Sequence, residues 1–189
     1  KYHNLPASGV GLGRLEFIIN SDIQIHPNAL IDFDKLKDQK LKRKIDSLTA
    51  GYKDKKQFYI DNLASGVAKI GAAFHPHKVI IRFSDFKTNE YRSLVGGSLY
   101  EPREENPMIG WRGASRYYDV KFAEAFRLEC LALKKVRDVF GLKNVIPMVP
   151  FCRTVEEGKK TLALMKKAGL TKTPVYAMCE IPSNVILAE

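Results

Sequence analysis

The sequence predicts an α/β protein built on about four parallel strands with helices between them. Short apolar runs of strand length alternate along the chain with segments whose apolar residues recur at helical spacing. Strands that alternate with helices pair in parallel, because the chain must cross back over the sheet before each new strand. The 189 residues are 45% hydrophobic and 28% charged, which is the composition of a globular domain and excludes wholesale disorder.

The first half of the chain contains two expected strands and two helices. Residues 9–19 are glycine-rich and then β-branched, which is typical of a short buried strand that leads to a loop. Apolar residues recur at helical spacing over residues 28–74, and Gly51 is expected to separate two helices there. Residues 78–83 form a continuous apolar run, as expected of a parallel strand buried on both faces.

A long polar segment separates the second strand from the next helix. Residues 84–116 show no clear periodicity, and a connection of this length is usually functional. We therefore expect an ordered functional loop. A helix follows over residues 119–140, and Gly141 stands where a helix commonly ends in a left-handed residue.

The last third of the chain repeats the alternation. Residues 145–151 predict a third strand, and Thr154 with Glu157 fits a capping box that opens a helix running to residue 168. Residues 175–181 predict the fourth strand. Its open edge would favour self-association, so we expect a homo-oligomer.

Each predicted strand carries a charged residue near or just after its carboxyl end. These residues are Arg14, Arg82, Arg153 and Glu180. In (β/α)8 barrels the chemistry occurs at that end of the strands, but four strands cannot close an eight-stranded barrel. We therefore expect an incomplete (β/α)8 barrel, a fragment of a larger domain. The first residue, Lys1, is not Met, which also suggests a piece of a longer chain.

The formal net charge of +10 raises the question of an anionic partner. Much of the excess lies in residues 35–44, where lysines interleave with apolar residues at helical spacing and no aromatic stacking partner is near. A solvated helix face explains this pattern best. A basic module that binds anions or nucleic acid through Lys37, Lys40 and Lys44 stays open as an alternative.

Other features of the composition concern the cellular compartment. No window approaches the ~18 apolar residues of a membrane span, and no secretory leader is visible, so we expect no membrane association. Cys130, Cys152 and Cys179 are odd in number and widely spaced, which argues against a disulfide framework or a zinc site. The expected compartment is the reducing cytoplasm. We expect Cys179 to be a buried structural thiol.

Two motifs have structural interpretations that outweigh the chemical ones. Residues 9–13 read GxGxG rather than the GxGxxG of dinucleotide sites, so these glycines are expected to allow a tight strand-to-loop path. No phosphate-binding GxxxxGK[ST] loop is present, so the chain itself has no P-loop for ATP. His75 and His77 precede a strand and should lie at the end of the sheet opposite Arg82.

The strand-end charges carry more chemical information. The guanidinium groups of Arg14 and Arg82 could hold phosphate or carboxylate oxygens, or could form internal salt bridges with Glu16 or Asp85. Glu180 could ligate Mg²⁺ or pair with an arginine. From the residues alone, both readings stay open.

Four stretches make the chain recognisable. They read GVGLGRLEFIIN from residue 9, IIRFSDFKTNEYRSLVGG from residue 80, YEPREENPMIGWRGASRY from residue 100 and MCEIPSN from residue 178. From about residue 9 to its end, the chain resembles the carboxyl-terminal domain of the phosphoenolpyruvate synthases (pyruvate, water dikinases). These enzymes belong to the wider family of phosphoenolpyruvate (PEP)-utilising enzymes. Residues 1–189 would then be part of one PEP/pyruvate-binding (β/α)8 barrel domain.

The resemblance implies a role for four residues. Arg14 and Arg82 match arginines that hold the phosphoryl and carboxylate oxygens of PEP or pyruvate, and Arg112 matches a further arginine near the phosphoryl group. Glu180 matches a substrate-site residue that ligates Mg²⁺, the implied cofactor. Family enzymes convert pyruvate, ATP and water to PEP, AMP and phosphate through a phosphohistidine on a mobile domain of the same polypeptide.

Some family features are missing from this sequence. The phosphohistidine motif, the ATP-binding portion, the later strands and a proton-donor cysteine have no counterpart here, so we expect the isolated chain to be inactive. The alternatives are an enzyme like pyruvate phosphate dikinase, a Mg²⁺-dependent barrel such as a 2-oxo-acid aldolase, and the basic binding module described above.

Overall fold

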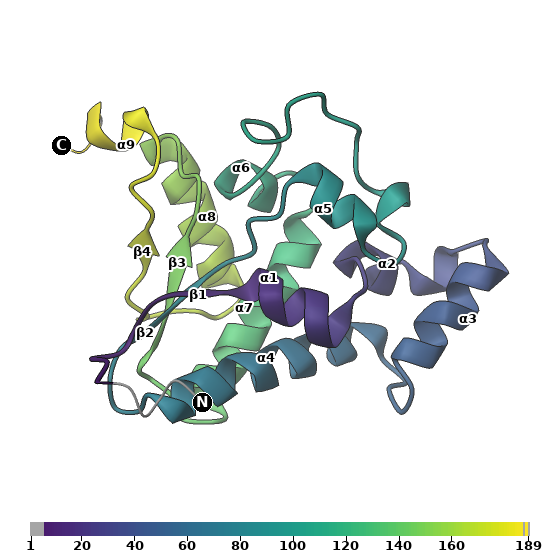
Figure 1. The fold of residues 1–189 in the computed structure, drawn as a ribbon, viewed down its shortest axis with the longest axis horizontal. Helices are drawn as coiled ribbons and strands as arrows, with labels where there is room; N and C mark the ends of the chain where they lie inside the picture. Colours follow the sequence, from purple (N-terminus) through teal and green to yellow (C-terminus); the bar gives the residue numbers. More distant parts are fainter. Residues whose placement is uncertain (1–5, 187, 189) are drawn as a thin grey trace.

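The computed structural model describes residues 6–186 and 188. Its four strands are β1 (Val10–Arg14), β2 (Val79–Arg82), β3 (Val145–Val149) and β4 (Tyr176–Ala177). They pair in parallel in the chain order β1-β2-β3-β4 (Figure 1). The predicted α/β class and the four parallel strands are confirmed. Four sequential parallel strands are half of the eight that a (β/α)8 barrel contains, which agrees with the predicted incomplete barrel.

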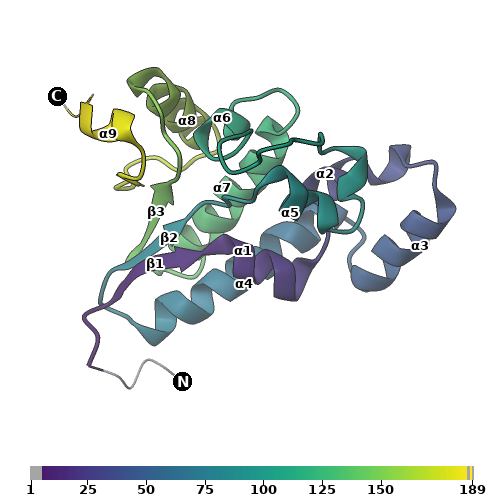
Figure 2. The same ribbon diagram turned by 45° about the horizontal axis from the view of Figure 1, so that its top comes forward.

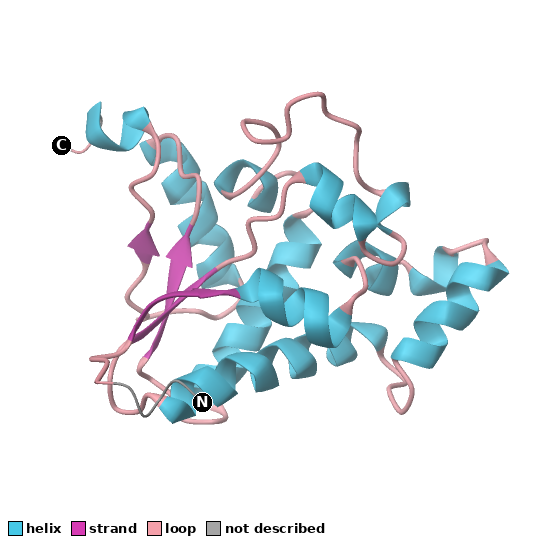
Figure 3. Cartoon of the chain, in the orientation of Figure 1, coloured by secondary structure: helices cyan, strands magenta, loops and turns pink. Residues whose placement is uncertain are grey.

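Helices occupy most of the chain between the strands, as Figure 3 shows in cyan. The α-helices of the described residues are α1 (Leu15–Ile18), α2 (Pro27–Ile31), α3 (Gln39–Leu48), α4 (Lys55–Ala73), α5 (Thr88–Ser93), α6 (Ala114–Tyr117), α7 (Ala123–Asp138), α8 (Val155–Lys167) and α9 (Pro182–Ile186). A π-helical turn (Ile19–Ile23) continues α1, and short 3₁₀ turns cover Phe33–Lys35 and Gly97–Leu99.

The hydrophobic core lies between the sheet and the long helices. Helices α4 and α7 pack against each other, and they also contact β2 and β3 respectively (Figure 2). Leu63 and Val67 of α4 and Leu133 and Val136 of α7 are fully buried there. Their spacing of three or four residues gives each helix one apolar face, which removes that face from water on packing.

The strands are shorter and more exposed than predicted. Strand β1 ends at Arg14, and helix α1 begins at Leu15, so the predicted strand and loop over residues 15–19 are helical. In β2, Val79 and Ile81 are fully buried but Ile80 is only half-buried, so the prediction of two buried faces is wrong for one face. The described residues provide a helical layer on the other face, and the core forms there.

The end of the predicted fourth strand is also different. Strand β4 covers two exposed residues rather than residues 175–181, because it is an outer strand paired only with β3. Cys179 follows it and is exposed, so the prediction of a buried thiol was wrong. Within the described residues, no further strand covers this edge.

The glycines of β1 have the expected structural role. A Cβ at Gly9 would lie 2.3 Å from the carbonyl oxygen of Lys78, and one at Gly13 would lie 2.5 Å from Ile81 Cδ1. Gly9 also has a φ of +139°. These residues let β1 approach β2 closely, which confirms the structural interpretation of the GxGxG motif.

The lysine-rich stretch forms a solvent-facing helix, as predicted. Lys40 and Lys44 are exposed on α3, whereas Ile45 is buried. The expectation that no aromatic ring is near was wrong, since Lys42 Nζ lies 5.4 Å from the ring centre of Phe33. In the described part of the chain, none of the helices is both long and apolar enough to span a membrane.

Candidate active site

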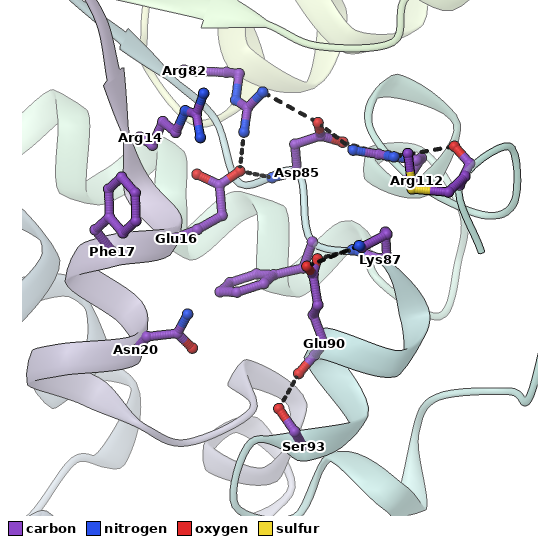
Figure 4. A pocket seen from close by; sticks show the side chains of 12 residues that line it. Arg14, Glu16, Phe17, Asn20, Arg82, Asp85, Lys87, Glu90, Ser93 and Arg112 are labelled. Carbon is purple, nitrogen blue, oxygen red and sulfur yellow. Dashed lines mark hydrogen bonds and ion pairs between the residues drawn. The ribbon is translucent and has the colours of Figure 1, made fainter.

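Three arginines from separate elements line one cavity. Arg14 ends β1 and Arg82 ends β2, and the two residues are paired in register. Arg112 comes from the loop before α6. The cavity has a volume of about 400 Å³ and opens to solvent (Figure 4). Its lining is Arg14, Glu16, Phe17, Asn20, Arg82, Asp85, Phe86, Lys87, Glu90, Ser93, Met108 and Arg112.

Arg82 forms ion pairs with Glu16 and Asp85, the two carboxylates that were considered as salt-bridge partners from the sequence. Its Nη2 donates to Glu16 Oε1 at 2.6 Å, and its Nη1 lies 3.3 Å from Asp85 Oδ2. Its Nε and Glu16 Oε2 are buried without a hydrogen-bond partner among the described residues. The internal salt bridges therefore exist, and they leave Arg82 at the wall of the cavity.

Arg112 is fixed by a fork of two hydrogen bonds. Its Nε donates to Asp85 Oδ1 at 3.0 Å and its Nη2 donates to Asp85 Oδ2 at 2.8 Å. The guanidinium also lies 4.1 Å from the ring centre of Phe151. Burial alone would lower the pKa of Arg112, but the bonds to Asp85 raise it above its ordinary value, so the group keeps its charge.

Arg14 differs from the other two arginines. It is exposed and forms no ion pair with any described residue. Its guanidinium carbon lies 5.9 Å from the ring centre of Phe17, which also lines the cavity. Arg14 is thus a charge that an incoming anion could use without displacing a carboxylate.

The loop that carries Arg112 is fastened at several points. Arg153, which follows β3, donates from Nη2 to the carbonyl of Gly110 at 3.2 Å and from Nη1 to Ser115 Oγ at 3.2 Å. The carboxylate of Glu104 accepts from the amide of Trp111 at 3.0 Å and from Thr88 Oγ1 at 2.8 Å. Arg153, one of the predicted strand-end charges, therefore holds this loop by hydrogen bonds. It does not line the cavity itself.

A buried ion pair anchors the same loop from its other side. Arg116 is fully buried and donates two hydrogen bonds to Glu101, at 2.6 and 2.9 Å. Its guanidinium lies 3.9 Å from the ring centre of Trp111. His26 Nε2 lies 2.9 Å from Glu101 Oε1. Burial alone would raise the pKa of Glu101, but the bonds from His26 and Arg116 lower it, so this carboxylate stays ionised.

Glu180 lies apart from the three arginines. It follows β4, its Oε1 accepts from the amide of Phe151 at 2.7 Å, and it does not line the cavity. The ring of Phe151 in turn lies 4.1 Å from the guanidinium carbon of Arg112, so Phe151 links the two residues. The structure therefore brings Arg14, Arg82 and Arg112 together, and Glu180 lies outside the cavity lining.

Glu180 fits a loosely held Mg²⁺ ion. Among the described residues, no group of three or more His, Cys, Asp or Glu side chains could hold a metal. Mg²⁺ is usually bound by one or two carboxylates, with waters and substrate oxygens completing its coordination. A single exposed carboxylate next to an anion site is compatible with that mode of binding.

Some residues of the site were not predicted. The cavity is also lined by residues of the α5 region, namely Lys87, Glu90 and Ser93. In addition, Glu129 of α7 accepts a hydrogen bond from the amide of Ser84, next to the cavity residue Asp85. Glu129 carries a signal that could have found it. It stands between Phe126 and Leu133 at helical spacing, so a carboxylate occupies a position of the apolar face.

The parallel sheet with arginines at the ends of adjacent strands agrees with the comparison with known proteins. Residues 1–189 match the family described as "PEP-utilising enzyme, PEP-binding domain", and the chain belongs to this family.

Relatives within the family are phosphoenolpyruvate synthases. The chain is 57% identical to that of Synechocystis sp. over 193 residues and 51% identical to that of Neisseria meningitidis over 192, each match covering 100% of this chain. It is 50% identical to that of Escherichia coli over 189 residues, or 98% of this chain. The chain covers 24% of each of these relatives, so it spans about a quarter of their length.

Proposed function

We propose that this chain is the first half of the PEP/pyruvate-binding barrel of a phosphoenolpyruvate synthase. The complete protein would convert pyruvate, ATP and water to PEP, AMP and phosphate. In the step at this site, pyruvate would lose a proton from its methyl carbon to a base, which gives the enolate. The bond between phosphorus and a histidine nitrogen then breaks, a bond forms between phosphorus and the enolate oxygen, and the histidine leaves without the phosphoryl group. The phosphohistidine would belong to another domain of the same polypeptide.

The observation that carries the proposal is the convergence of Arg14, Arg82 and Arg112 on one open cavity. PEP and pyruvate are small anions, and the planar fork of an arginine matches the oxygens of carboxylate and phosphoryl groups. Phosphoryl transfer depends mainly on positioning and on neutralising the charge of the transferred group. Arg82 and Arg112, which are fixed by carboxylates, and Arg14, at the end of the adjacent strand, together meet both needs.

Each arginine would have a distinct role. Arg14 is free of ion pairs with described residues and would bind the incoming anion directly. Arg82 and Arg112 are oriented by Glu16 and Asp85, so their positions are set before substrate arrives. Such orientation lowers the entropy cost of holding reacting groups in place.

Glu180 would hold the Mg²⁺ cofactor of the family. When bound, the ion would supply positive charge that stabilises the negative charge developing on the oxygen of pyruvate. Glu180 is connected to Arg112 through Phe151, which donates its amide to the carboxylate and packs its ring against the guanidinium. Glu180 is the only ligand proposed from the described residues, so we expect the remaining coordination to come from elsewhere in the complete protein and from substrate and water.

The test is the variant Arg82→Ala in the complete protein. PEP formation should be abolished, while the phosphorylation of the mobile-domain histidine by ATP should continue, because that half-reaction does not use this site. A triple variant that neutralises Lys37, which precedes α3, and Lys40 and Lys44 of α3 is the matched control and should keep both activities. Unchanged PEP formation in Arg82→Ala would contradict the proposal.

The other expectations stay predictions. Binding to nucleic acid through α3 would appear as salt-dependent retention that is lost in the same triple lysine variant, and we expect none. A cytoplasmic location stays an expectation, which rests on the odd number and wide spacing of the three cysteines. A homo-oligomer and the inactivity of the isolated chain are likewise expected.

A further inference from the structure

Ser84 lies between Arg82 and Asp85 in the sequence. Its amide, its hydroxyl and its carbonyl all form hydrogen bonds with buried side chains. Its amide donates to Glu129 Oε2 at 3.1 Å, and its hydroxyl makes a short hydrogen bond to Glu129 Oε1. The same hydroxyl lies 2.6 Å from the hydroxyl of Tyr91, and its carbonyl accepts from the hydroxyl of Tyr117 at 2.7 Å. Ser84 has no solvent exposure.

The next residue is fixed from the other side. The amide of Asp85 donates to Glu16 Oε1 at 2.8 Å, so the peptide between Ser84 and Asp85 has both its carbonyl and its amide hydrogen-bonded. The carboxylate of Asp85 then forms the fork with Arg112. Glu129 is therefore linked to Arg112 by its hydrogen bonds to Ser84, by the peptide bond between Ser84 and Asp85, and by the hydrogen bonds of Asp85 to Arg112.

The hydrogen bonds to Ser84 account for the carboxyl group of Glu129. Glu129 is fully buried on the core face of α7, where the other buried residues of the same stripe, such as Phe126 and Leu133, are apolar. Both of its oxygens are used on Ser84. A buried carboxyl group is costly unless it is hydrogen-bonded, so a residue of this kind at a core position needs a specific partner.

We propose that Glu129 is a positioning residue for substrate binding, acting through Ser84 to hold Asp85 and thereby Arg112 in place. The inference rests on the proposed function, because it concerns the same cavity. Glu129 is not among the residues that line the cavity, and its hydrogen bonds to the site are made to Ser84. A misplacement of reacting groups by about 1 Å can cost roughly 100-fold in rate.

The hydrogen-bonding pattern offers a discriminating pair of variants. In Glu129→Gln, the side-chain oxygen of the glutamine can still accept from the backbone amide of Ser84. Its side-chain nitrogen can donate to the hydroxyl of Ser84, which then donates to the hydroxyl of Tyr91. In Glu129→Ala, both bonds are lost. Cys130→Ala is the matched control, since Cys130 is an equally buried neighbour on α7 for which no contact with Ser84 is found in the described structure.

The experiment measures the KM and kcat for PEP formation and the binding of PEP to the complete protein. Glu129→Ala should raise the KM for pyruvate and weaken PEP binding by about tenfold or more. Glu129→Gln should recover most of that loss, and Cys130→Ala should bind like the parent. ATP-dependent phosphorylation of the histidine should continue in all variants, which reports that the rest of the protein is folded.

Three outcomes would overturn the inference. Glu129→Ala could bind PEP as tightly as the parent, Glu129→Gln could fail to recover any of the loss, or Cys130→Ala could lose as much affinity as Glu129→Ala. If Glu129→Ala does not fold, Ser84→Ala replaces it and should weaken binding by about the same factor. If the parent protein binds no PEP, the proposed function is refuted. If the parent binds PEP, Arg82→Ala binds it poorly and Glu129→Ala binds it normally, only this inference is refuted.

Discussion

Arg112 and Asp85 are joined by two hydrogen bonds of 3.0 and 2.8 Å, and this pair links the long loop to the end of β2. Asp85 also lies 3.3 Å from Arg82 Nη1, so one carboxylate serves two of the three arginines. Its side chain is almost completely buried. Asp85 therefore helps to position both guanidinium groups, together with Glu16 at Arg82 and Phe151 at Arg112.

Asp85→Asn is expected to weaken PEP binding. The asparagine would turn an amide nitrogen toward an arginine donor and lose the charge that orients both guanidinium groups. Since hydrogen bonds to charged groups contribute about 1.5–3 kcal/mol, the affinity for PEP should fall by roughly 10- to 100-fold, as measured by calorimetry on the complete protein. Tighter binding would instead show that Asp85 competes with substrate for the arginines.

Arg116→Ala should destabilise the loop before α6. The change leaves Glu101 buried without its main partner and removes the group stacked on Trp111. Breaking a buried ion pair in this way costs about 3–5 kcal/mol. Hydrogen exchange of peptides covering residues 100–117 should accelerate strongly. The control is Arg127→Ala, because Arg127 is 43% exposed in its pair with Glu124. An equal effect in the control would contradict the assignment.

Gly113→Ala should displace the Arg112 loop from the end of β3. Gly113 has a φ of +61°, and an added Cβ would lie 2.6 Å from the carbonyl oxygen of Pro150. Gly141 has a φ of +73° but open space around it, so Gly141→Ala costs only the backbone strain of about 1–2 kcal/mol. The clash should add about 1–3 kcal/mol in Gly113→Ala. Equal thermal shifts of the two variants would refute this.

The stability of this region should depend on pH through Glu129. Burial raises the pKa of Glu129 from 4.5 to about 7, with a further rise from the charge of Glu16, and the bonds from Ser84 oppose the shift. The raised pKa means that the folded state binds the proton more tightly, so its stabilising effect is complete below pH ~4.5 and is lost as the pH rises through ~7. Between pH ~4.5 and ~7, the free energy of unfolding should fall by about 3 kcal/mol.

Glu129→Gln should remove this dependence. Other groups facing Glu129 are Tyr59 of α4, Tyr91 of α5 and Tyr117 and Arg116 of α6. Burial raises the pKa of all three tyrosines well above 10, so they stay neutral in this range. Hydrogen exchange of β2 and α7 peptides, corrected for the intrinsic rate, should show protection falling with pH in the parent and much less in Glu129→Gln. The same slope in both proteins would contradict the assignment.

The order of the strands can be predicted from the spacing of apolar residues along the sequence. The proximity of Arg14 and Arg82 can be predicted from their positions at the strand ends. Arg14 and Arg82 come directly at the ends of parallel strands, and parallel strands place those ends along one edge. The short extent of β4 could not be predicted, since it depends on how many strands lie beside it rather than on its own residues.

The supporting network was also beyond the sequence pattern. Arg116, Glu101 and His26 are separated by up to 90 residues and belong to segments without periodicity, so nothing local indicates that they meet. Glu180 illustrates the opposite case. Its resemblance to a family residue is specific, yet its side chain lies outside the cavity lining and its metal role stays a prediction.

The most direct test of the central claim is the affinity of the complete protein for PEP with and without the side chain of Arg14. Arg14 is exposed and forms no ion pair with a described residue, so Arg14→Ala should leave the fold unchanged. If the cavity binds PEP through its arginines, calorimetry should show at least about tenfold weaker binding. Equal affinity in Arg14→Ala and the parent would contradict the claim.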